Sequence, residues 1–196
     1  MESLAPGQLG RADGPLVWID CEMTGLDPRS DRLIEIAVLI TNGNLEVLDE
    51  GVDFVIKTER SVLDNMNEWC IKQHGQSGLT QACLDSTHSH DHVERTVLDY
   101  IKSRIPNKGT ACLAGNSVHA DKMFLDVHMP SITDWLHYRI VDVSTIKELH
   151  WRWFPQQPYQ KKISAHRALD DIRGSISELQ WYRENVFRDP ETVKKR

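Results

Sequence analysis

The chain has 196 residues, enough for one domain with a substantial core but too few for a separate substrate-binding domain. It carries 29 acidic and 23 basic residues and a formal net charge of -6 at pH 7, which argues against a long basic track for polymeric nucleic acid. Any charged substrate is therefore expected to be short or bound by one end.

Cysteine usage and hydropathy indicate the compartment. The four cysteines, at positions 21, 70, 83 and 112, show no CxxC pairing and lie in apolar or helical patterns, so we interpret them as reduced packing residues of an intracellular protein. No apolar run approaches the roughly 18 to 20 residues of a membrane span. We therefore expect no membrane partner, and find no signal for a stable protein partner.

The first half of the chain predicts three strands and a helix. Residues 1–14 are expected to be disordered and residues 15–187 to form the domain, with a basic tail over 188–196. Strands are predicted over 15–20, 32–40 and 51–57, and the tight turns between them are typical of an antiparallel meander. The pattern becomes helical from about residue 61, and a helix over 92–105 is expected to start with a capping box of Asp91 and Glu94.

The second half alternates between strands and helices. Short buried strands over 112–117 and 138–144 each lead into a helix, over 119–129 and 145–154. This alternation predicts parallel additions to the sheet. A final helix over 166–187 has an apolar face wide enough to cover a sheet. The sequence thus predicts an α/β fold, with a mixed five-stranded sheet of three antiparallel strands plus parallel additions, flanked by helices.

Asp20 and Glu22 lie at the end of the first strand and form the first candidate site. Their spacing of two turns both side chains to the same face of the strand, with Cys21 on the other. Two adjacent carboxylates repel each other unless a cation joins them. The alternative is a strand that simply runs out into solvent, where acidic residues are common.

Asp121 lies after the predicted strand over 112–117, near the start of a helix. A carboxylate there can serve as a ligand or can cap the helix, because the helix dipole favours an anion. Asn116, Ser117 and His119 lie at or just beyond the carboxyl end of this strand, where open α/β sheets collect ligands.

The segment SAHRALDD offers two carboxylates after His166. On an ideal helix Asp170 lies about 40° from His166 around the axis and Asp171 nearer 140°, which favours Asp170 as the partner. If His166 precedes the helix, that argument loses its force. The residues alone leave the choice open.

Three segments, WIDCE, GNSVHAD and SAHRALDD, resemble the three motifs of the DEDDh exonuclease family, whose last motif is a histidine followed five positions later by an aspartate. Within that family the chain is similar to the eukaryotic type of oligoribonuclease, a group of small-RNA exonucleases. The supporting stretches are DCEMTGLDP, the run from Trp69 to Leu79, LAGNSVHADKMFLD, MPSITDWLHYRIVDVSTIKEL and HRALDDI, within residues 16–186. The resemblance implies a ribonuclease H-like fold.

The resemblance also implies a catalytic site. Its positions assign two Mg²⁺ or Mn²⁺ ions to Asp20, Glu22, Asp121 and Asp171, and the role of general base to His166. The implied activity is 3′-to-5′ degradation of very short RNA, especially dinucleotides, to mononucleotide 5′-phosphates by two-metal-ion hydrolysis. A histidine with a pKa near 6.5 can take a proton from water at neutral pH.

Further positions are implied to bind substrate. Leu26 resembles a wedge against one base, Trp69 a platform for the other, and His74 lies in the same wall. Ser117, Arg139, Ser144 and Thr145 match positions that cap the 5′ phosphate of a dinucleotide. Because the family works as a homodimer, Tyr138 and Arg139 are expected to reach the neighbouring subunit's site. Expected substrates are short RNA, with short DNA as an alternative, in the cytoplasm or mitochondrion.

Other features have simpler interpretations. The run THSHDH, with His88, His90 and His92, lacks the usual spacing of a zinc site. The aromatic stretch from Trp151 to Phe154 is interpreted as a helix that packs its last turn on the core. Competing functions are a catalytically silent binding relative and an exonuclease that trims longer RNA or DNA; the acidic balance counts against the latter.

Overall fold

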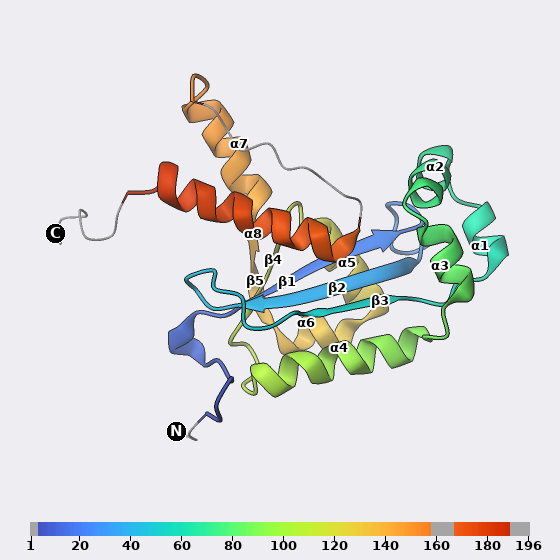
Figure 1. Cartoon of the computed structure of the whole chain (residues 1–196), viewed down its shortest axis with the longest axis horizontal. Helices are drawn as coiled ribbons and strands as arrows, with labels where there is room; N and C mark the ends of the chain where they lie inside the picture. Colours follow the sequence, from blue (N-terminus) through green and yellow to red (C-terminus); the bar gives the residue numbers. More distant parts are fainter. Residues whose placement is uncertain (1–3, 158–166, 189–196) are drawn as a thin grey trace.

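The computed structural model describes residues 4–157 and 167–188, which form a five-stranded sheet flanked by helices (Figure 1). The strands are β1 (Leu16–Met23), β2 (Leu33–Thr41), β3 (Val52–Val55), β4 (Cys112–Gly115) and β5 (His137–Asp142), in the order β3-β2-β1-β4-β5. β1 pairs antiparallel with β2, and β2 with β3, whereas β4 runs parallel to β1 and β5 parallel to β4. The predicted fold class is confirmed.

Helices cover both faces of the sheet (Figure 1). One face packs against α8 (Ala168–Asn185), beside which lies α7 (Val143–Trp153). The other face packs against α4 (His90–Arg104), α5 (His119–His128) and α6 (Pro130–Trp135). The short helices α1 (Arg60–Asp64), α2 (Glu68–Gln76) and α3 (Leu79–Asp85) gather at one end around a third apolar cluster, and a 3-10 turn, η1 (Arg11–Asp13), precedes β1.

The strand period of two divides β1 and β2 between these layers. Trp18, Ala37 and Leu39 pack with α8, whereas alternate residues such as Ile19 and Ile36 pack on the opposite face. All nine residues of β2 are buried, because both of its faces are covered. On this register Asp20 and Glu22, two and four residues after Trp18, lie on the side of the sheet that α8 covers.

Two local expectations are wrong. Helix α4 is capped by Ser89, whose hydroxyl accepts a hydrogen bond from His92 N at 3.3 Å, so Asp91 lies inside the first turn. Glu94 cannot complete a capping box because its Oε1 accepts hydrogen bonds from the amide and hydroxyl of Ser131. Trp151 and Trp153 are 64% and 65% exposed instead of packed, since the C-terminal end of α7 extends away from the sheet (Figure 1).

The cysteines and the helices agree with the sequence in two further respects. All four cysteines carry free thiols, and Cys21, Cys70 and Cys83 are buried, as expected of packing residues. Over residues 4–157 and 167–188, no helix is both long and apolar enough to cross a membrane.

Candidate active site

Strand β1 and helix α8 bring three carboxylates together. Asp20, Glu22 and Asp171 each offer one oxygen within 4.8 Å of the others. Asp171 is 5% exposed and faces the sheet, whereas Asp170 is exposed. Of the two acids after His166, the structure therefore brings Asp171 to the residues of β1.

Asp121 approaches the same site from α5. It is 7% exposed, and its Oδ1 accepts a hydrogen bond of 2.9 Å from Cys21 N, which lies between Asp20 and Glu22 in β1. Asp121 stands in the first turn of α5 but is not the N-cap residue, which is Val118. Its carboxylate thus joins the helix to the strand.

The electrostatics of these carboxyls favour a bound cation. Burial, reinforced by the charge of Asp20, raises the pKa of Glu22 to about 8. Burial and Asp20 also raise the pKa of Asp121 to about 8, although the Cys21 amide opposes this shift. A divalent cation would supply the missing positive charge, and an all-oxygen donor set suits a hard ion such as Mg²⁺ or Mn²⁺. The described residues therefore fit the implied metal.

His166 lies outside the described residues, which resume at Arg167. Arg167 is the N-cap residue of α8 and forms an ion pair with Glu35 of β2 at 3.1 Å. Glu35 stands directly opposite Glu22 in the β1–β2 register.

A cavity of about 440 Å³ adjoins the carboxylates. It is lined by Cys21, Glu22, Met23, Gly25, Leu26, Asn67, Trp69, Cys70 and His74. Leu26 is 82% exposed and Trp69 63%, so both present apolar surface to a ligand. The structure thus groups the three residues expected to bind bases, and places them beside Glu22.

His74 differs from the other two because it is only 2% exposed. Its Nε2 donates a hydrogen bond of 2.9 Å to the carbonyl of Met23, and its Nδ1 lies 3.9 Å from Glu22 Oε2. With so little exposed surface, His74 supports the wall and Glu22 rather than offering a face for stacking.

A second cavity, of about 530 Å³, lies at the ends of β4 and β5. It is lined by Ser117, His119, Asp142, Ser144, Thr145, Lys147, Glu148, Leu149 and Arg152. Ser117 adopts a left-handed φ of 52°, and its amide donates to Asp142 Oδ1 and Ser144 Oγ, each at 2.9 Å. These bonds join Ser117 to Ser144, and with Thr145 three of the four residues expected to cap a phosphate line this cavity.

The fourth residue of that group, Arg139, lies elsewhere. It is on edge strand β5, with its guanidinium 5.2 Å from the ring centroid of Tyr138, and is not among the described residues that line the second cavity. Tyr138 is 75% exposed. Both residues therefore lie exposed on the edge strand of the sheet.

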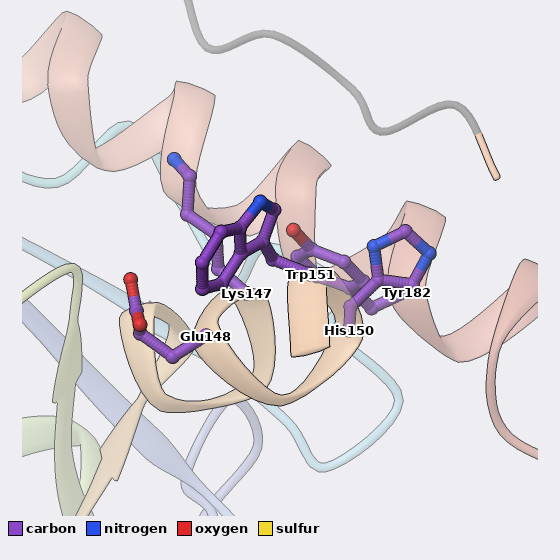
Figure 2. Close-up of a pocket in the computed structure, with 5 residues that line it drawn as sticks. All are labelled: Lys147, Glu148, His150, Trp151 and Tyr182. Atoms are coloured by element: carbon purple, nitrogen blue, oxygen red, sulfur yellow. The ribbon is translucent and has the colours of Figure 1, made fainter. Parts of the chain in front are cut away.

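Figure 2 shows a third cavity, of about 360 Å³, between α7 and α8, lined by Lys147, Glu148, His150, Trp151 and Tyr182. Tyr182 lies eleven residues after Asp171 on α8, which is about 16 Å along a helix axis. This cavity is therefore remote from the carboxylates. The THSHDH histidines form no further group of three metal ligands within the described ranges; the rings of His88 and His92 stack at 5.5 Å.

Two residues near the site have functions that the sequence reasoning missed. Glu35 is a single acid within a strand of nine buried residues, a pattern that could have marked it as structurally committed. Asn116 links three elements: its amide nitrogen donates to Ser175 and Glu178 of α8, while its oxygen accepts from Ser144. Such a hub depends on tertiary contacts, and no local pattern indicates it.

Comparison with known proteins identifies the family. The family model described as Exonuclease matches residues 17–179. A probable oligoribonuclease of Schizosaccharomyces pombe is 56% identical over 169 residues, covering 86% of this chain and 67% of the relative. This chain belongs to the oligoribonuclease family.

Other oligoribonucleases match over similar lengths. The mitochondrial oligoribonuclease of Mus musculus is 50% identical over 184 residues, covering 92% of this chain and 77% of the relative. The oligoribonuclease of Halorhodospira halophila is 46% identical over 183 residues, covering 93% and 100%. The family similarity thus extends over nearly the whole described chain.

Solved structures show the same fold at low sequence identity. Exonuclease I of E. coli, in a zinc-bound complex with single-stranded DNA, has a TM-score of 0.69 at 12% identity, covering 89% of this chain and 41% of that one. Exonuclease I of Methylocaldum szegediense has a TM-score of 0.64 at 21% identity, covering 88% and 41%. The chain thus spans about two fifths of their length, and the likeness supports the ribonuclease H-like fold alone.

Proposed function

We propose that this protein hydrolyses very short RNA, above all dinucleotides, to mononucleotide 5′-phosphates with two divalent metal ions and a histidine base. Its membership of the oligoribonuclease family makes it a 3′-to-5′ exoribonuclease. The observation that carries the proposal is the meeting of Asp20, Glu22 and Asp171 beside a cavity walled by Leu26 and Trp69. The same Glu22 belongs to both the carboxylate group and the cavity wall.

The four acidic residues and His166 have different roles in the proposed hydrolysis. Asp20, Glu22, Asp121 and Asp171 would hold two Mg²⁺ or Mn²⁺ ions, which stabilise the charge that develops on the phosphate during hydrolysis. His166 would take the proton from the attacking water, a role suited to an imidazole near its ordinary pKa.

The preference for short RNA follows from the walls of two cavities, which lie where the parallel strands of the sheet end. The carboxyl ends of the parallel strands β1, β4 and β5 meet there, and ligands of open α/β sheets bind at such ends. Leu26 and Trp69 would hold the bases, while the hydroxyls of Ser117, Ser144 and Thr145 would bind the 5′ phosphate. A 5′ phosphate held by a wall leaves little room for further nucleotides.

Assembly as a homodimer would complete this wall. Tyr138 and Arg139 are exposed on edge strand β5 and do not line the second cavity of their own chain. A partner subunit on this edge would receive both side chains near its own site. Relatives of the mitochondrial type and bacterial relatives support action in the mitochondrion or cytoplasm.

A length series tests the function. Oligoribonucleotides from two residues upward, labelled at the 5′ end, are digested with Mg²⁺ by the wild type and by Asp171→Ala. We expect the dinucleotide to be cleaved fastest and the variant to be inactive. Hydrolysis rates that stay constant or rise with RNA length would refute the dinucleotide preference. A wild type that cleaves none of these RNAs would refute the proposed activity.

A further inference from the structure

Glu35 is a fully buried carboxylate of β2 that pairs with Arg167, the N-cap residue of α8. It is 0% exposed, and its Oε1 accepts a hydrogen bond of 3.2 Å from Nε of Arg167 and lies 3.1 Å from Nη2 of the same guanidinium. Glu35 thus binds the start of a helix that lies more than a hundred residues later in the chain.

A buried carboxylate paired with an arginine is an energetically costly way to stabilise a helix. A Ser or Asp at the N-cap position would satisfy amides of the first turn locally, yet the N-cap residue here is Arg167, which makes no side-chain cap. Burying a carboxylate with an arginine is often no more stable than packing apolar groups of the same volume. Helix stability alone therefore does not account for Glu35.

The pair does fix the position of the last acidic residue of the site. Asp171 N donates to Arg167 O at 3.0 Å, so Asp171 follows the anchored residue by one helical turn. On the sheet side, Glu35 is the cross-strand partner of Glu22. Glu22, Glu35, Arg167 and Asp171 therefore form a closed chain of contacts, which sets the separation of the two carboxylates that approach within 4.8 Å.

We propose that Glu35 and Arg167 are a positioning pair that holds Asp171 against Glu22. The proposal rests on the proposed function, since it assigns the pair to that site. Neither residue touches the reacting atoms, so both act through Asp171.

Removing the positive charge of Arg167 separates positioning from a simple charge effect. Near a cation site, loss of a cationic side chain should by itself strengthen metal binding. Loss of a residue that orients a ligand should weaken it, typically by about 10-fold to 100-fold in affinity or activity. Arg167→Gln therefore gives opposite results under the two explanations.

The experiment measures Mn²⁺ binding to the full-length protein by calorimetry, together with hydrolysis of a 5′-phosphorylated RNA dinucleotide. We expect Arg167→Gln to weaken Mn²⁺ binding and to lower kcat, each by about tenfold or more, with a smaller effect on KM. Arg167→Lys, which keeps the charge but not the planar fork, should recover part of the loss. Mn²⁺ affinity equal to or tighter than wild type, with unchanged kcat, would overturn the proposal.

Arg173→Gln is the matched control. Arg173 lies on the same helix and pairs with Glu50 at 3.4 Å, but Glu50 is 99% exposed and this pair lies at the surface. The control removes the same charge and should leave both measurements at wild-type values.

A second variant covers the case in which Arg167→Gln does not fold. Glu35→Gln combined with Arg167→Gln keeps the local net charge and the approximate volumes, and thermal unfolding checks its integrity. This double variant should also lose Mn²⁺ affinity. If it folds and keeps the Mn²⁺ affinity and kcat of the wild type, the positioning role of the pair is contradicted. If the wild type bound Mn²⁺ in an Arg167-dependent way but left RNA intact, the proposed function would fail while the positioning of Asp171 stood.

Discussion

The amide of Cys21 donates to Asp121 Oδ1 at 2.9 Å, so the same carboxylate that could hold a metal also fastens α5 to β1. Asp121→Asn should separate these roles, because its remaining oxygen can accept the Cys21 bond while the negative charge is lost. We expect unfolding temperature within a few degrees of wild type but Mn²⁺ binding weakened at least tenfold. Calorimetry and thermal unfolding measure the two effects, and tight Mn²⁺ binding by this variant would remove Asp121 from the ligand set.

The raised pKa values of Glu22 and Asp121, both about 8, predict how stability depends on pH without metal. In the unfolded chain such carboxyls ionise at about pH 4. A carboxyl with a higher pKa in the folded state contributes stability below pH 4, and that contribution is lost as the pH rises through 8.

We therefore expect the metal-free protein to unfold at lower temperature at pH 8.5 than at pH 5, and Mg²⁺ to restore more stability at the higher pH. Unfolding followed in EDTA and in Mg²⁺ measures both. The unfolding temperature of Asp121→Asn should depend less steeply on pH. If the unfolding temperature of the wild type in EDTA did not change with pH, the raised pKa values of these carboxyls would be contradicted.

His166→Ala tests the general base. We expect it to abolish turnover with only a modest loss of Mn²⁺ affinity, whereas Asp20→Asn should lose both, because Asp20 belongs to the carboxylate group. Steady-state hydrolysis and calorimetry distinguish these outcomes. Near wild-type turnover by His166→Ala would exclude the histidine as the base.

Trp69→Ala tests the wall of the cavity beside Glu22. Base stacking is worth about 1 to 3 kcal/mol, so we expect the KM for a dinucleotide to rise by about 5-fold to 150-fold. Trp151→Ala is a suitable control because Trp151 is 64% exposed, as Trp69 is 63%, but lines the remote cavity of Figure 2. Equal effects of the two substitutions would remove Trp69 from the substrate wall.

The sequence predicted those parts of the fold that depend on local patterns. Apolar runs and turn residues located the strands, and a spacing of two predicted that Asp20 and Glu22 share a face. The choice between Asp170 and Asp171 could not be made from angles around a helix measured from His166, since it depends on where β1 lies under α8. In the structure Asp171 is buried beside Asp20 and Glu22, whereas Asp170 is exposed.

Features that depend on partners far apart in the chain could not be predicted from the sequence. Glu94 looked like half of a capping box, yet it binds Ser131 of another helix. Glu35 looked like an isolated acid in an apolar strand, and its partner Arg167 lies on α8. Trp151 was expected to be buried, but whether a helix end reaches the core depends on the angle at which it leaves the sheet.

The three clustered carboxylates come from β1 and from α8, the last helix of the described chain, so the cluster spans residues 20 to 171 of 196. A growing polypeptide that lacks the final helix has the sheet residues but not the third acid. Hydrolytic competence would consequently arise only once α8 has been synthesised, and fragments ending before α8 should be inert toward RNA even where they collapse into a compact state.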